Sequence, residues 1–139
     1  MKFSDPTLAE RAFYDAFTTL DATAMRRVWC DSDAVYCIHP GGPALRGAEA
    51  VARSWAEIFE SADPPSIEFR PLERQTGDTL AIHLVEESIR PGSATDKPAS
   101  TVLATNTYLL QNGEWHMLSH HSSLPLVKGS RTRSRRTMH

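Results

Sequence analysis

Apolar residues recur at helical spacing in three stretches of the first half of the chain, which predicts three amphipathic helices. The first begins at Asp5, because an aspartate suits the N-cap and the proline that follows it suits the first helical turn. A second, short helix follows Asp21, another N-capping residue. The third begins near Gly47 and carries an apolar stripe over residues 51–62, and the prolines at 64 and 65 end it.

After residue 65 the apolar period changes to two, which is typical of strands. With one strand in the first half, the predicted strands cover roughly 33–39, 67–72, 79–90, 100–111 and 114–123. Helices followed by hairpin-linked strands predict an α+β fold, with three helices from the N-terminal half packed on a mostly antiparallel sheet. A strongly curved sheet closing over the third helix forms a cone, and we expect an internal cavity that binds a ligand.

The length of 139 residues fits one domain, which we expect to span residues 1–127. Residues 128–139 hold five basic residues and no acid, so ten bases and seventeen acids remain in the body of the chain. A basic tail can bind nucleic acid or acidic lipid, but this one lacks aromatic residues for base stacking and an apolar face for a membrane. We therefore expect a disordered tail, no nucleic-acid partner and no membrane partner.

The start of the chain has no signal-peptide pattern, and no apolar run is long enough to span a bilayer. The two cysteines, Cys30 and Cys37, are expected to stay reduced. Together these features predict a cytoplasmic protein.

Several short segments resemble the SnoaL-like branch of the nuclear transport factor 2-like superfamily in their order and spacing. They are the helix pair around residues 17–29, the segment 34–47 that ends in Leu45-Arg46-Gly47, Ser54-Trp55, Thr105-Asn106, and residues 112–123. The resemblance implies a cone-shaped cavity and a homodimer formed through the sheet. The superfamily includes ketosteroid isomerases, polyketide cyclases, limonene epoxide hydrolases, dehydratases, a kinase association domain and many non-catalytic members, so the fold alone does not fix the function.

His39 is the first candidate catalytic residue. In the ketosteroid isomerase relatives an Asp-Pro pair ends the equivalent strand and supplies the general base, and here the pair is His39-Pro40. Strand alternation puts Val35, Cys37 and His39 on one face, so Cys37 is a candidate substrate contact. The alternative is a histidine that hydrogen-bonds a neighbouring loop.

His121 is the second candidate catalytic residue. Alternation puts it and Ser123 on the face of the last strand that carries Trp115 and Met117, and those two large apolar residues predict that this face is the interior. The same alternation puts His116 and His120 on the opposite face. The alternative is a core histidine satisfied by hydrogen bonding, with Asn106 as its partner.

Asn106 lies in mid-strand, where asparagine is disfavoured, so it is expected to orient a histidine or bind a substrate carbonyl, or else to pin the strand pairing. Trp55 and Trp29 are expected to line the cavity or to be ordinary core. Tyr14 is a further substrate-binding candidate, although the best alignment puts Phe13 at the position of the oxyanion-donating tyrosine of ketosteroid isomerases. No carboxylic-acid donor is identified, and both points argue against steroid isomerisation. Alternation allows at most one of Glu86 and Glu87 to face the cavity.

No metal site is predicted, because two histidines without a third ligand do not define one, and no nucleotide or phosphate motif implies a cofactor. The first functional hypothesis is a pocket for a small apolar or carbonyl-containing molecule, in a cofactor-independent isomerase, cyclase or dehydratase with His39 as acid or base. The alternative is a non-catalytic ligand-binding, dimerisation or association module.

Overall fold

The computed structural model describes residues 2–92 and 98–125. These described residues form three helices: α1 (Pro6–Thr19), α2 (Ala22–Val28) and α3 (Ala48–Glu60). The strands are β1 (Tyr36–Ile38), β2 (Leu45–Arg46), β3 (Ser66–Thr76), β4 (Leu80–Arg90), β5 (Ser100–Gln111) and β6 (Glu114–Ser123). The basic tail predicted at 128–139 lies outside the described residues.

All six strands form one sheet in the order β2-β1-β6-β5-β4-β3. The pairs from β3 to β6 are antiparallel, and so is β1 with β2, whereas β1 runs parallel to β6. The predicted α+β fold with a mostly antiparallel sheet is therefore confirmed. Strand β1 is shorter than the predicted 33–39, and β2 was not predicted because it has only two residues.

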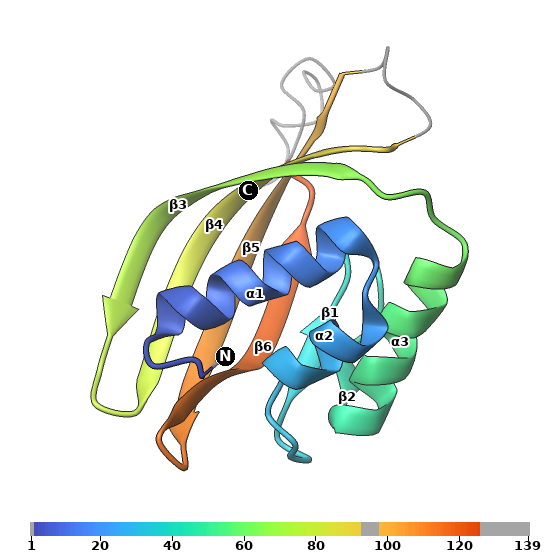
Figure 1. Ribbon diagram of the computed structural model, residues 1–139. Helices are drawn as coiled ribbons and strands as arrows, with labels where there is room; N and C mark the ends of the chain where they lie inside the picture. Colours follow the sequence, from blue (N-terminus) through green and yellow to red (C-terminus); the bar gives the residue numbers. More distant parts are fainter. Residues whose placement is uncertain (1, 93–97, 126–139) are drawn as a thin grey trace, which may run out of the picture.

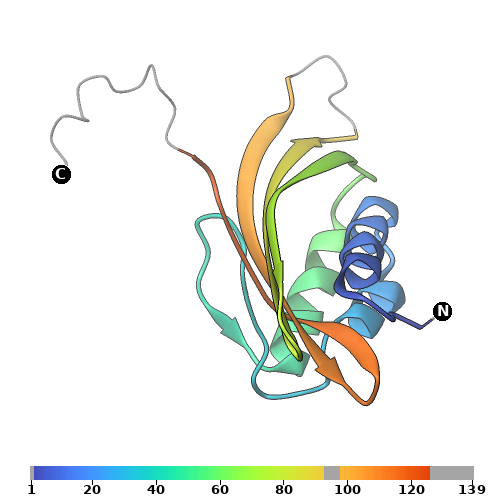
Figure 2. The same cartoon turned by 90° about the vertical axis from the view of Figure 1, so that its left-hand side faces the viewer.

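The three helices lie against the same face of the curved sheet (Figures 1 and 2). Helix α1 crosses in front of β3 to β6, and α3 packs beside β1 and β2 (Figure 1). We call the covered side of the sheet the inner face and the opposite side the outer face.

Local sequence explains where the helices begin and end. The Asp5 carboxylate accepts hydrogen bonds from the backbone N–H groups of Thr7 and Leu8, as the N-cap prediction requires. Helix α1 ends at Thr19, and its C-cap residue, Leu20, adopts the left-handed conformation. The Asp21 carboxylate then accepts a bond from the Ala24 N–H and starts α2.

The space between the helices and the inner face is filled with side chains. Val51, Trp55 and Phe59 are the buried residues of α3 and lie in this space. Trp55 packs edge-on against Phe13 of α1, with ring centroids 5.5 Å apart. Tyr108 and Met117 of the sheet are fully buried in the same core. The aromatic residues expected to line a cavity thus make up much of the packed core.

Candidate functional site: a buried polar row on the inner face

Helix α1 is joined to the inner face by two polar pairs. Glu10 and Tyr14 are four residues apart on α1, so they lie on the same side of the helix. His83 and Glu87 are four residues apart on β4, so both point to the same face of the sheet. Glu10 contacts His83, and Tyr14 contacts Glu87, so the two pairs join α1 to β4 at two points.

The second pair belongs to a row of four buried polar side chains that crosses three strands. The Tyr14 hydroxyl donates to the Glu87 carboxylate at 2.5 Å and accepts from the Asn106 amide at 3.1 Å. The Asn106 carbonyl oxygen accepts from Nδ1 of His120 at 2.6 Å. Each of the four residues is at most 2% exposed. We call Glu87, Tyr14, Asn106 and His120 the polar row.

Burial sets the protonation states in the polar row. It raises the pKa of Glu87 to about 7, against the opposing effect of the Tyr14 hydrogen bond. It lowers the pKa of His120 to about 3, with the neighbouring His39 and His121 adding to the effect. Burial also raises the pKa of Tyr14 well above its ordinary value. Near neutral pH His120 is therefore neutral, with Nδ1 protonated and Nε2 able to accept a hydrogen bond.

His39 lies next to this row, at the end of β1. The Ser54 hydroxyl donates its proton to the Val51 carbonyl at 2.8 Å, so His39 Nε2, 3.2 Å from the same oxygen, must donate to it. This leaves Nδ1 of His39 as the basic nitrogen. The imidazole packs edge-on against Trp55, with ring centroids 4.8 Å apart, and burial lowers the pKa of His39. A neutral imidazole can accept a proton near neutral pH.

The predicted placement of His121 and Ser123 is wrong, because both are exposed and their neighbours His120 and Ser122 are buried. The cause is a β-bulge in β6. Thr107 pairs with Ser119, whereas Tyr108 pairs with Met117, so Leu118 is an extra residue. One extra residue reverses the alternation beyond it and turns His120 inward.

The remaining predicted site residues divide between two regions. Cys37 is fully buried beside His39, with Sγ 3.7 Å from Nε2, and burial raises its pKa to about 12, so it is an inert thiol. Trp55 lies in the core next to both histidines of the region, His39 and His120. Trp29, in contrast, follows α2 and is held against β6 through a bridge to Met117, away from the polar row.

The sequence prediction missed Glu87 and His120. Strand parity favoured Glu86 over Glu87, because the large apolar residues Leu80, Ile82 and Leu84 share the parity of Glu86, and the structure shows that the opposite side of β4 is the buried one. Glu87 also supplies the buried carboxylic acid that the sequence did not identify. Parity gave the wrong answer for His120, because no residue in the segment 116–120 marks the bulge.

A second buried cluster surrounds Glu10. Its carboxylate bonds to Nδ1 of His83 at 2.8 Å and to the Arg74 guanidinium. His83 Nε2 and the Tyr108 hydroxyl are buried there without a hydrogen-bond partner in the described part of the chain. The hydrogen bonds from His83 and Arg74 outweigh burial and keep the pKa of Glu10 below its ordinary value.

The outer face has the opposite character. Leu80, Ile82 and Leu84 alternate along β4 and are 42, 42 and 38% exposed. Ile82 pairs with Thr107, Thr107 with Ser119, and Ser119 with Tyr36, which is 41% exposed. Within residues 2–92 and 98–125, no helix covers this face (Figure 2).

Among the described residues no group of three or more histidine, cysteine, aspartate or glutamate side chains is arranged to hold a metal ion. No helix in the same residues is long and apolar enough to cross a membrane.

The curved sheet, the three helices on its inner face and the polar core define an α+β cone of the nuclear transport factor 2-like kind. The sequence profile of the SnoaL-like domain matches residues 9–127, and the chain belongs to this family. The predicted family is therefore confirmed.

Solved structures support the same assignment. A protein from Thiobacillus denitrificans, assigned as a calcium/calmodulin-dependent protein kinase type II association domain, is 31% identical. Its TM-score is 0.85, and the match covers 91% of this chain and 99% of that one. A Streptomyces avermitilis protein of the NTF2-like family, assigned as a dehydratase, is 27% identical with a TM-score of 0.75, covering 87% and 94%.

One relative is a longer protein. The F-box protein SKIP8 of Arabidopsis thaliana is 33% identical over 111 residues, which is 75% of this chain but 42% of the F-box protein. The chain thus spans less than half of that relative.

Proposed function

We propose that this domain is a self-association module that forms a homodimer through the outer face of its sheet. The observation that carries the proposal is the exposed apolar row of Leu80, Ile82 and Leu84, with Tyr36 on the same face. Large exposed apolar patches mark interaction surfaces. Burying the exposed part of each aliphatic side chain would contribute roughly 1–2 kcal/mol, and a two-fold dimer buries every one twice.

The relatives support the same direction. The structure that is 31% identical is assigned as an association domain, and the match covers nearly its whole length. The F-box protein matches over only 42% of its length, as expected of a domain that is combined with other segments. By analogy, this domain would bring two copies of its chain together.

Light scattering with paired variants tests the proposal. We expect wild-type protein to have about twice the chain mass of 15.5 kDa, and Ile82→Lys to have the mass of a single chain. A lysine at the centre of an apolar contact would be desolvated without a partner. Thr23→Lys is the matched control, because it adds the same charge on α2 and should leave the mass unchanged. A monomeric wild type, or the same loss of mass in both variants, contradicts the proposal.

A second candidate function is acid–base chemistry on a small carbonyl or hydroxyl compound. The observation that favours it is the juxtaposition of a basic nitrogen on His39, an acceptor nitrogen on His120 and a carboxylic acid, Glu87, with a pKa of about 7. The tight packing of Trp55 against both histidines puts this function second, since a substrate would have to displace core side chains.

His39→Ala tests the second function. It should abolish turnover of any carbonyl substrate while changing the free energy of unfolding by about 1 kcal/mol or less, because the side chain is only half-buried. Turnover that survives in His39→Ala, or a loss of activity accompanied by a large loss of stability, would make His39 structural. The same variant should not alter the mass, which separates this function from association.

A further inference from the structure

The β-bulge in β6 turns a histidine onto the outer face of the sheet. Because Leu118 is the extra residue, His120 points inward and His121 points outward, where its side chain is exposed. Strand β6 lies between β1 and β5, in the interior of the sheet (Figure 1). His121 is therefore away from both edge strands of the outer face.

His121 shares the outer face with the apolar residues of the proposed dimer contact. On one side it pairs with Thr105 of β5, which pairs with Leu84 of β4, and on the other side it pairs with Ile38 of β1. Residues paired across strands point to the same face, so these four form one row across the sheet. The row beside it consists of Ile82, Thr107, Ser119 and Tyr36.

Protonation of His121 would put an uncompensated positive charge into these two rows. Its cross-strand neighbours, Thr105 and Ile38, offer a hydroxyl and an aliphatic side chain. Along β6 the nearest residues on the same face are Ser119 and Ser123, and the Ser119 hydroxyl is already hydrogen-bonded to β5 at 2.6 Å. Among the described residues, none forms a hydrogen bond or an ion pair with the His121 ring.

The acids of the outer face lie on other strands or at the far end of β6. Glu86, on β4, is already paired with an arginine of β3 at 2.6 Å. Glu114 is the first residue of β6, at the opposite end from His121, and is paired with an arginine of α2. Behind β6, His39 and His120 are imidazoles as well, so they would add repulsion. The other ionisable residues that share the outer face by register are Glu68 and Glu73 on β3, Arg90 on β4, Arg46 on β2 and His116 on β6.

We infer that pH controls self-association of this domain through His121, whose neutral ring fits between two outer faces and whose protonated ring does not. The inference rests on the proposed dimer. In a two-fold dimer the outer faces cover each other, so both copies of His121 leave water. A charge buried without a partner is strongly disfavoured, so the ring must lose its proton before the faces close.

The direction of the pH effect follows from this linkage. Histidine changes its charge between pH 5 and 8. The dimer should therefore be at full strength near pH 8 and should weaken as the pH falls. An imidazole in water is roughly one-tenth neutral at pH 5.5, and each dimer requires two neutral rings. The dissociation constant should thus rise on the order of 100-fold between pH 8 and pH 5.5.

Light scattering over a dilution series at pH 8 and pH 5.5 measures this change, and three variants assign it. His121→Gln is polar but uncharged, so it should dimerise at both pH values with dissociation constants within about threefold of each other. His121→Lys is charged at both and should be monomeric at both. His116→Gln is the matched control, because it removes a histidine that already has Glu114 at 3.3 Å, and it should keep the wild-type pH dependence. Circular dichroism at each pH checks that the variants are folded.

The outcomes separate this inference from the dimer itself. A wild type with the same dissociation constant at both pH values overturns the inference and leaves the dimer standing. So does a 100-fold change that persists in His121→Gln or disappears in His116→Gln. A wild type that is monomeric at pH 8 overturns the proposed dimer, and the inference with it.

Discussion

Each face of the sheet carries one group of residues that departs from the usual distribution. The inner face, covered by helices, holds the buried polar side chains His83, Glu87, Asn106 and His120. The outer face, which no described helix covers, carries Leu80, Ile82 and Leu84. Most domains place such residues the other way round.

The difference indicates what each face is for. Nearly all inner polar groups bond to one another, so they fix how α1 sits on the sheet, at the expense of desolvation. The outer apolar side chains Leu80, Ile82 and Leu84 keep about two-fifths of their surface exposed, so the free energy of burying that part is available to the proposed partner. The inner face therefore fixes how α1 sits on the sheet, and the outer face is the surface of the proposed dimer.

The largest effect on stability is expected for Asn106→Ala. It removes the link in the polar row and leaves both the His120 Nδ1–H and the Tyr14 hydroxyl short of a partner. Because two buried groups then lack a hydrogen-bond partner, the free energy of unfolding should fall by about 4 kcal/mol, measured by urea denaturation. Thr101→Ala, on the exposed side of the same strand, should change it by less than about 0.5 kcal/mol. Equal effects would mean that the row does not stabilise the fold.

Next in size is a pH effect at Glu87. Its folded-state pKa of about 7 lies above the ordinary 4.5. Its contribution to the free energy of unfolding is therefore fully present below pH 4.5 and is lost as the pH rises through 7. Glu87→Gln is uncharged at every pH and can still accept from Tyr14. It should match wild type at pH 4.5 and be more stable by up to about 3 kcal/mol at pH 8.

The comparison between variants is needed because His120 changes the free energy of unfolding with pH in the opposite direction to Glu87. Its folded-state pKa of about 3 lies below the ordinary 6.5, so its contribution is present above pH 6.5 and is lost as the pH falls. In wild type the two slopes largely cancel between pH 4.5 and 6.5, whereas the difference between Glu87→Gln and wild type isolates Glu87. A difference that does not change with pH would contradict the buried-acid assignment.

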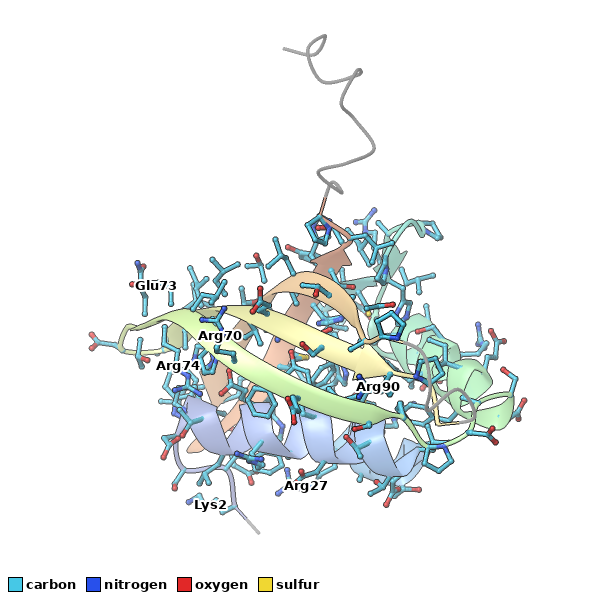
Figure 3. All side chains as sticks on the ribbon, turned by 90° about the horizontal axis from the view of Figure 1, so that it is seen from above. Lys2, Arg27, Arg70, Glu73, Arg74 and Arg90 are labelled. Atoms are coloured by element: carbon cyan, nitrogen blue, oxygen red, sulfur yellow. The ribbon has the colours of Figure 1, made fainter. Side chains whose placement is uncertain are left out.

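The smallest effects on stability are expected for two arginines on β3, both labelled in Figure 3, and the two should differ from each other. Arg74 pairs with Glu10, which is 1% exposed, and Arg70 pairs with the partly exposed Glu86. Arg74→Ala should lower the free energy of unfolding by about 2 kcal/mol, because it weakens the compensation of a buried charge. Arg70→Ala should lower it by less than about 0.5 kcal/mol, as for other surface pairs. The reverse order in denaturation would show that Glu10 does not need Arg74.

The sequence was sufficient for the helices, for five of the six described strands and for the family, because periodicity and capping act locally. It also indicated a special role for Asn106, where propensity and position conflict. It failed at His120 and His121, where one extra residue at Leu118 reverses the faces and leaves no local signal. The contacts of Glu87 with Tyr14 depend on how α1 crosses the sheet, which is a tertiary property.

Distance measurement between spin labels is the most direct test that the outer face is the contact. The native cysteines, Cys30 and Cys37, are buried, so labels can be placed at Thr105→Cys on the outer face or at Thr23→Cys on α2. Packed sheets lie about 10 Å apart, so labels at position 105 should be within roughly 30 Å of each other in the dimer. The domain is about 35–40 Å across, so labels at position 23 should be at least about 20 Å farther apart. A short distance at position 23, or no defined distance at position 105, would contradict association through the outer face.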